Sequence, residues 1–150
     1  FYCWQEQEDQ LRWWGGYGSA ENCETRFERG QGLVGQCQLE RKTIVLSELP
    51  DGYVKICSGS GSASARSLIL VPVLSNGETL AVIELAGFQA PTAQQLEILE
   101  AAAPTVCLNL EILQRNLKAQ KLALELQGYR TSLNFSQARA ERLLFAEDPS

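Results

Sequence analysis

The chain has a short apolar–polar period in its first half and a helical period from residue 92 onward. Residues 1–7 (FYCWQEQ) and 11–17 (LRWWGGY) are aromatic and alternating, which predicts two strands of a hairpin. A stronger pair follows at 67–74 (SLILVPVL) and 78–86 (ETLAVIELA), joined by Asn76-Gly77, a dipeptide that favours tight hairpin turns. Two hairpins of this kind argue against a parallel βαβ sheet.

Between the two hairpins the pattern is weaker, and the predicted elements are short. They are a loop at 18–30, a short helix ending near Leu39, a strand at 43–46 (TIVL), either a short helix or an extended segment at 53–57 (YVKIC), and a flexible small-residue loop at 58–65 (SGSGSASA). Pro72 has no amide proton, so it should lie at a bulge or at a position without a ladder hydrogen bond.

A long helix is predicted from residue 92. Thr92 and Gln95 have the spacing of a capping box, in which each side chain bonds the other residue's backbone N–H. Pro104 should kink the helix, because it removes a hydrogen bond and clashes with the preceding turn. Apolar residues recur every three or four positions, a heptad-type stripe. Its members are Leu96, Leu99, Ala103, Val106, Leu110, Leu113 and Leu117.

The stripe persists after a slip of phase near 118–121. Its later members are Leu122, Leu126, Tyr129 and Leu133. A continuous helix of this extent would be roughly 75 Å long, which is more than its own sheet can cover. The far half therefore needs a partner helix, another domain, or a fold-back hairpin broken at Gly128. We expect a homodimeric coiled coil, because an exposed leucine seam costs solubility. The residues assigned to dimerisation are Leu110, Leu113, Leu117 and Leu126.

Composition excludes several kinds of chemistry. The 150 residues include no histidine, which removes Ser-His-Asp and Cys-His catalytic pairs and histidine-ligated zinc or haem. The net charge is −5, and the basic residues are scattered, so we expect no nucleic-acid partner. No apolar stretch approaches the roughly 18 residues of a membrane span. The chain also lacks methionine, and we interpret it as a fragment of a longer protein.

The cysteines indicate a reducing compartment. There are five of them, at positions 3, 23, 37, 57 and 107, and no CxxC motif occurs. A disulfide framework in a short secreted chain would favour an even number. We therefore expect reduced thiols in a cytoplasmic protein, mostly packed as small apolar residues. No metal site and no catalytic residue is predicted.

Three glycines match a dinucleotide-binding pattern, but their surroundings do not. Gly30, Gly32 and Gly35 have the GxGxxG spacing, and Glu48 or Asp51 follows at about the expected distance. That motif requires a buried apolar strand immediately before it, whereas residues 24–29 read ETRFER. We favour a tight turn whose glycines let a short helix pack closely on a sheet.

Three single residues each allow a functional and a purely structural interpretation. Cys57 beside the small-residue loop is either a reactive thiol, with Lys55 lowering its pKa, or a packing residue. Arg66 either binds an anionic ligand at a pocket mouth or is solvated. Glu84 lies within an apolar strand, on the same face as Val82, which leaves open whether it faces solvent or lines a pocket.

Three segments together resemble a GAF domain, of the type that precedes the kinase core in bacterial hybrid sensor histidine kinases. They are 30–37 (GQGLVGQC), 44–58 (IVLSELPDGYVKICS) and 68–88 (LILVPVLSNGETLAVIELAGF). The resemblance covers roughly residues 1–115, and the family's opening helix would precede Phe1. It implies an α+β, GAF/PAS-like fold, with an antiparallel sheet of five or six strands, helices on one face and a long C-terminal signalling helix. We expect a GAF domain at 1–113 and a coiled-coil helix at 114–150.

The resemblance also implies a small-ligand pocket between the sheet and residues 36–66. The residues assigned to it are Tyr53, Cys57, Arg66 and Glu84. The family's cyclic-nucleotide signature is not recognisable here, and bilin and histidine-bound haem are disfavoured because histidine is absent. No cofactor is therefore assigned. The free-methionine-sulfoxide reductases of the family use essential cysteines; Cys57 lies near one such position, but Val34 stands where another is expected.

From these expectations we predict a non-enzymatic sensory and dimerisation module of a cytoplasmic bacterial signal-transduction protein. The pocket would be coupled through the helix to an output domain of the parent chain, as in a two-component system. The alternatives are a reductase that uses Cys57 and a structural GAF domain without a ligand.

Overall fold

The computed structural model describes residues 1–19 and 24–146, with side chains in the last helix described through residue 139 and at residue 142. The chain divides into two units, Phe1–Asn109 and Leu110–Ser150, which we describe separately. Among the described residues, no helix combines the length and apolar character needed to cross a bilayer.

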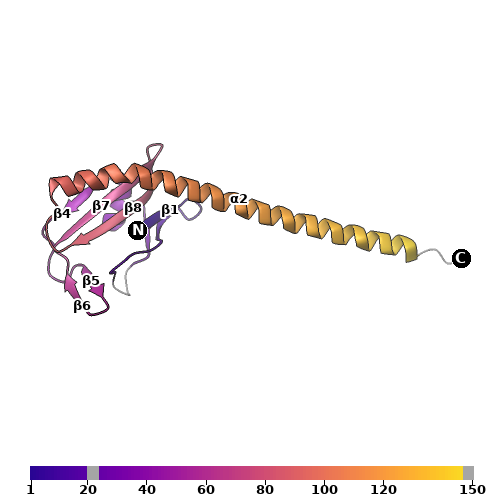
Figure 1. The fold of residues 1–150 in the computed structure, drawn as a ribbon, viewed down its shortest axis with the longest axis horizontal. Helices are drawn as coiled ribbons and strands as arrows, with labels where there is room; N and C mark the ends of the chain where they lie inside the picture. The colour runs from indigo at the N-terminus through magenta and orange to yellow at the C-terminus, as the bar shows by residue number, and fades with distance from the viewer. Residues whose placement is uncertain (20–23, 147–150) are drawn as a thin grey trace. The chain divides into compact units, whose positions relative to one another are not determined.

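The first unit is built on a six-stranded sheet with the order β3-β2-β1-β8-β7-β4, in which all neighbouring strands are antiparallel (Figure 1). Its strands are β1 (Tyr2–Gln5), β2 (Gln10–Trp13), β3 (Arg26–Glu28), β4 (Ile44–Leu46), β7 (Ser67–Ser75) and β8 (Glu78–Gly87). A separate hairpin pairs β5 (Lys55–Ser58) with β6 (Gly61–Ser64), and the helices are α1 (Gly32–Glu40) and α2 (Ala93–Ala146). The antiparallel α+β architecture expected from the sequence is confirmed.

Both predicted hairpins are present, whereas two short strands were missed. The sequence predicted loops where β3 and β6 lie. The three residues of β3 are polar apart from Phe27, and β6 is made of Gly, Ser and Ala, which have low strand propensity. Each is a strand because a neighbour pairs with it: β2 with β3, and β5 with β6. That pairing also resolves the ambiguous segment at 53–57, which contributes to β5.

Pro72 lies in β7 opposite Val82 of β8, next to an irregular step in the ladder. The register between β7 and β8 shifts between Val73 and Leu74, so the bulge begins one residue after the proline. On the other side of β7, β4 pairs only with Leu68, Ile69 and Leu70. The proline therefore lies beyond the pairing with β4, where β7 has one neighbouring strand instead of two.

Helices cover both faces of the sheet, which corrects the expectation that they lie on one face. On one face Leu68 and Leu70 pack with Val34 and Cys37 of α1. On the other, Ile69 and Val71 pack with Ala103, Leu96 and Leu99 of α2, whose first turns lie over the sheet in Figure 1. The reason is that β7 is apolar at nearly every position and successive side chains point to opposite faces, so both faces require cover.

The three glycines of the GxGxxG pattern bring α1 close to β3. Gly30 and Gly32 have positive φ angles of 79° and 59°. A Cβ atom at Gly35 would lie 2.3 Å from the carbonyl oxygen of Glu28, a distance no side chain tolerates. The preceding strand, β3, is a short antiparallel edge strand. Close packing of a helix on the sheet is confirmed as the role of these glycines.

Helix α2 is continuous from Ala93 to Ala146, through Pro104 and through Gly128. Its start matches the predicted capping box: the Thr92 N–H donates to Gln95 Oε1 at 2.9 Å, and the Gln95 N–H donates to Thr92 Oγ1 at 3.3 Å. Because no break occurs at Gly128, the described helix does not fold back on itself.

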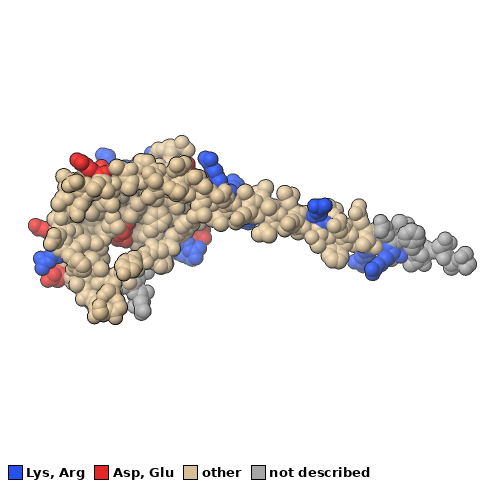
Figure 2. Space-filling model, viewed as in Figure 1, with Lys and Arg blue, Asp and Glu red and all other residues tan. Residues whose placement is uncertain are grey.

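Charged side chains form no single-sign patch on the visible face of the first unit. Figure 2 shows acidic and basic residues interspersed there. An ion pair links Arg41, at the end of α1, to Glu78, at the start of β8, with Arg41 Nη2 2.7 Å from Glu78 Oε1, and both side chains are exposed. An exposed pair of this kind contributes little to stability.

Candidate functional site

Glu84 lies on the α1 face of the sheet and is half-buried there. In the β7–β8 ladder it is opposite Leu70, and directly opposed residues share a face. The Tyr2 hydroxyl donates a hydrogen bond of 2.9 Å to Glu84 Oε2. The structure thus resolves the question left by alternation: Glu84 lies on the face of the sheet that α1 covers. Sequence reasoning missed Tyr2, since only the β1–β8 pairing brings residues 82 positions apart together.

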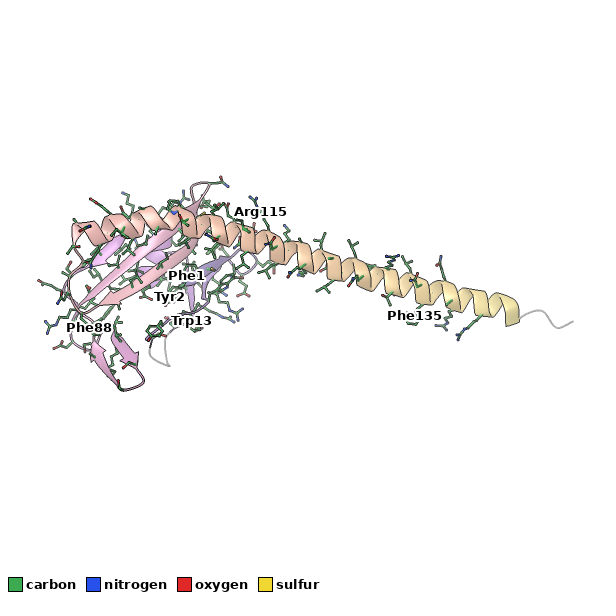
Figure 3. All side chains as sticks on the ribbon, viewed as in Figure 1. Phe1, Tyr2, Trp13, Phe88, Arg115 and Phe135 are labelled. Carbon is green, nitrogen blue, oxygen red and sulfur yellow. The ribbon has the colours of Figure 1, made fainter. Side chains whose placement is uncertain are left out.

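Aromatic side chains continue this face from Tyr2. Tyr2 is opposite Trp13 in the β1–β2 hairpin, and the two lie close together in Figure 3. The Tyr2 ring also meets Phe27 edge to face, with ring centroids 5.3 Å apart. A half-buried carboxylate beside aromatic rings is suited to bind a donor-bearing or positively charged group of a small molecule.

Cys57 lies on β5, opposite Ser62, and its side chain is half-buried. Its backbone N–H donates to the Gly18 carbonyl oxygen at 2.8 Å. Gly18 has a positive φ of 68°, and a Cβ atom there would lie 3.3 Å from the Cys57 carbonyl oxygen. The loop after β2 is thereby attached to the β5–β6 hairpin.

The other two assigned residues are at the surface. Tyr53 is exposed in a turn, where its backbone N–H donates to the Pro50 carbonyl oxygen at 3.1 Å. Arg66 is also exposed; its backbone N–H donates to Gly87, and its carbonyl accepts the N–H of Leu49. Within residues 1–19 and 24–146, no hydrogen bond or ion pair given by the structure joins any two of Tyr53, Cys57, Arg66 and Glu84.

Two other thiols are held in their protonated form. Burial raises the pKa of Cys3 to about 12. Burial, reinforced by the nearby Glu40 carboxylate, raises the pKa of Cys37 to about 12, and its Sγ donates to the Lys42 carbonyl at 3.4 Å. Since the thiolate is the nucleophile, neither thiol is suited to attack a substrate near neutral pH. Cys107 is buried as well, and Cys23 lies outside the described residues.

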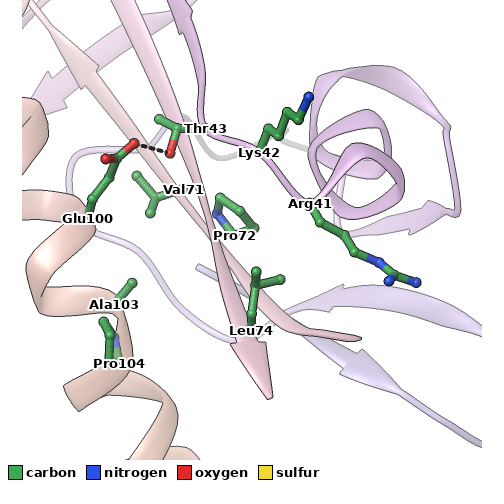
Figure 4. A pocket seen from close by; sticks show the side chains of 9 residues that line it. All are labelled: Arg41, Lys42, Thr43, Val71, Pro72, Leu74, Glu100, Ala103 and Pro104. Carbon is green, nitrogen blue, oxygen red and sulfur yellow. Dashed lines mark hydrogen bonds between the residues drawn. The ribbon is translucent and has the colours of Figure 1, made fainter. Parts of the chain in front are cut away.

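A hollow of about 540 Å³ opens between the end of α1 and helix α2 (Figure 4). Val71, Pro72 and Leu74 of β7 line it on one side, and Ala103 lines it on the α2 side. Thr43 Oγ1 donates to Glu100 Oε1 at 2.8 Å across it, as drawn in Figure 4. Arg41 and Lys42 at its rim add positive charge.

A second hollow of about 640 Å³ lies between the end of β8 and the start of α2. Ile69, Phe88 and Leu99 are among its apolar lining residues. At its rim Ser67 Oγ donates to the Gln89 carbonyl at 2.6 Å. The lining contains no ionisable side chain, so its chemistry suits an apolar group.

Both hollows lie on the α2 side of the sheet, and neither is lined by the four residues assigned to the ligand pocket. On the α1 side, where the sequence led us to expect that pocket, Leu49 and Val54 pack against the core. The segment between β4 and β5 thus fills part of the expected space. Among the described residues, no three His, Cys, Asp or Glu side chains are grouped to hold a metal ion.

Comparison with known families identifies the fold. The family model described as "GAF domain" matches residues 2–111. None of the curated proteins matches the chain.

Solved structures with the same fold include two reductases. Free methionine-R-sulfoxide reductase from Neisseria meningitidis, in complex with its substrate, is 22% identical with a TM-score of 0.55, over 77% of this chain and 67% of that chain. The type II enzyme from Thermoplasma acidophilum is 18% identical with a TM-score of 0.51, over 71% and 72%. The structure of a GAF domain is 24% identical with a TM-score of 0.52, over 71% of this chain and 59% of that chain. At these sequence identities the similarity shows a shared fold alone.

Proposed function

This chain belongs to the GAF domain family, and from that premise we propose that it is a non-enzymatic sensory and dimerisation module of a larger signalling protein. In this proposal a small molecule binds the GAF unit, and helix α2 transmits its presence to an output domain, as in sensor histidine kinases. The protein would act in the cytoplasm, where its thiols stay reduced.

The observation that carries the proposal is the apolar surface of α2 beyond Leu110. Leu122, Leu126, Tyr129 and Leu133 are exposed in the single chain. Long isolated helices gain most of their stability from packing an apolar face, so this surface is expected to be covered in the assembled protein. A second copy of α2 can cover it with the same residues.

The thiols differ in their suitability for an enzymatic role. Two of the four described cysteines have a pKa raised to about 12, and Cys57 has Ser62, not a second cysteine, opposite it in its hairpin. A thiol enzyme needs an activated thiolate and commonly a resolving thiol. Cys3 and Cys37 therefore do not suit this role, and an enzymatic alternative depends on Cys57.

Sedimentation equilibrium of the 150-residue chain tests the proposal. We expect a dimer at micromolar concentration. A chain that is still monomeric at about 100 µM would refute dimerisation. That result would mean a standard free energy of association weaker than about −5.5 kcal/mol. A thermal-shift screen with nucleotides, amino acids and organic acids tests ligand binding, since a ligand that binds the folded state raises Tm.

A second candidate function is a thiol-dependent reductase of free methionine sulfoxide. It is favoured by the similarity of the fold to the free methionine-R-sulfoxide reductases from Neisseria meningitidis and Thermoplasma acidophilum and by the partly exposed position of Cys57. Turnover of free methionine-R-sulfoxide by the unmodified chain, lost in Cys57→Ser and retained in Ser62→Ala, would support it. No turnover by the unmodified chain would remove it.

A further inference from the structure

Helix α2 carries two apolar stripes, and only one of them packs on the sheet. Leu96, Leu99 and Ala103 pack against Ile69 and Val71. Leu110, which continues their spacing, is only 7% exposed. This first stripe is therefore covered within the single chain for most of its length, and Leu110 is not accessible to a second copy.

The second stripe has an unbroken heptad spacing. Its steps are 4, 3, 4, 3, 4, 3 and 4 residues, and every member is exposed. The members are Leu108, Ile112, Arg115, Ala119, Leu122, Leu126, Tyr129 and Leu133. It passes through residues 118–121 without a slip. The apparent slip in the leucine pattern near 118–121 therefore has a simple explanation. The pattern follows the first stripe as far as Leu117 and resumes at Leu122 with members of the second stripe.

We propose that α2 pairs with α2 of a second copy through this second stripe, as a parallel, in-register two-stranded coiled coil. The inference rests on the proposed dimeric function and specifies its surface. Heptad spacing sustained over more than three repeats is the pattern that keeps a seam facing a partner helix along its whole length. Leu117 and Leu124 lie on the other side of the helix and are outside the seam.

Charge at the flanks of the stripe fits a parallel arrangement. Glu125 immediately precedes Leu126 in the seam, and Arg130 immediately follows Tyr129. In a parallel coiled coil, the residue just before one core position contacts the residue five positions later on the partner helix, which lies just after the next core position. Glu125 of one copy and Arg130 of the other therefore have opposite charge where they meet, twice in each dimer.

Arg115 is the single charged member of the stripe. It and Phe135 lie on opposite sides of the helix in Figure 3. A polar residue in a coiled-coil core fixes register and oligomeric state while weakening the pairing. Two guanidinium groups brought together here would repel, which weakens the pairing.

A matched pair of variants tests the surface. Leu124 and Leu126 are 68% and 64% exposed in the single chain, but two residues turn a helix by about 200°, so only Leu126 is in the seam. Leu126→Asp should raise the dissociation constant of the dimer at least about 100-fold, whereas Leu124→Asp should change it less than about threefold. Circular dichroism of both variants checks that the helix content is retained.

Charge exchange tests the orientation. Glu125→Arg should weaken the dimer, and the double variant Glu125→Arg with Arg130→Glu should restore it. A double variant as weak as the single one would overturn the parallel, in-register arrangement.

The outcomes separate this inference from the proposed function. A monomeric unmodified chain refutes dimerisation itself. A dimer that is disrupted by Leu124→Asp or Leu117→Asp and tolerates Leu126→Asp keeps the function and overturns the proposed seam.

Discussion

The two apolar stripes of α2 have the same heptad-type spacing but differ in what covers them. The first is in contact with the sheet through Leu96, Leu99 and Ala103. The second, from Leu108 to Leu133, is exposed at every described position. The comparison shows that periodicity identifies an apolar face, while the rest of the fold decides whether that face belongs to the core or to an interface.

The largest effect is expected at the covered stripe. Ala103 is 8% exposed and packs against Ile69 and Val71. Ala103→Asp places an unpaired charge there and should lower the free energy of unfolding by about 3–5 kcal/mol. Urea denaturation measures this change.

The neighbouring residue is the matched control. Ala102 is exposed, so Ala102→Asp should change stability by less than about 0.5 kcal/mol. Equal destabilisation by the two variants would contradict packing of this stripe on the sheet.

At the exposed stripe a substitution is expected to strengthen assembly. Arg115→Leu removes the charged member of the seam and should tighten the dimer by about 1–2 kcal/mol, or roughly tenfold in dissociation constant. Analytical ultracentrifugation measures the shift, with Lys121→Leu as the control, because it also removes a positive charge but lies two residues after Ala119 and therefore on the other side of the helix. A weaker dimer in Arg115→Leu would place the arginine outside the seam.

The smallest effect is expected at Thr92, immediately before the start of α2, the helix that carries both stripes. Thr92→Ala removes the Thr92 Oγ1 acceptor for the Gln95 N–H and should cost about 1 kcal/mol of stability, with no change in the dimer constant. Thermal unfolding followed at 222 nm measures it. Gln94→Ala, at an exposed helical position without this role, should be near neutral; a loss as large as that of Thr92→Ala would argue against the capping box.

The hairpins and α2 were predictable because their signals are local. Asn76-Gly77 between two apolar runs specifies one hairpin, and Thr92 with Gln95 specifies the helix start. Strands β3 and β6 were not predictable, since their own residues favour loops and only neighbouring strands pair with them.

The candidate site was predictable in part. Alternation placed Glu84 on the same face as Val82. Which helix covers that face depends on where α1 and α2 pack on the sheet, and the local pattern does not show this. The hydrogen bond from Tyr2 to Glu84 joins residues far apart in sequence, and no local pattern indicates it. In the same way, the leucine pattern alone merged two stripes of α2, because burial on the sheet is what distinguishes them.

Disulfide trapping tests the central claim most directly. Leu122 belongs to the second stripe, and Leu124, two residues later, lies on the other side of the helix. Two cysteines cross-link only when their Cα atoms lie within about 7 Å, as at facing seam positions of a parallel coiled coil. Under mild oxidation, Leu122→Cys should form a covalent dimer well above the background of the native cysteines, and Leu124→Cys should not. Equal trapping of the two variants, or preferential trapping of Leu124→Cys, would contradict the proposed pairing of α2.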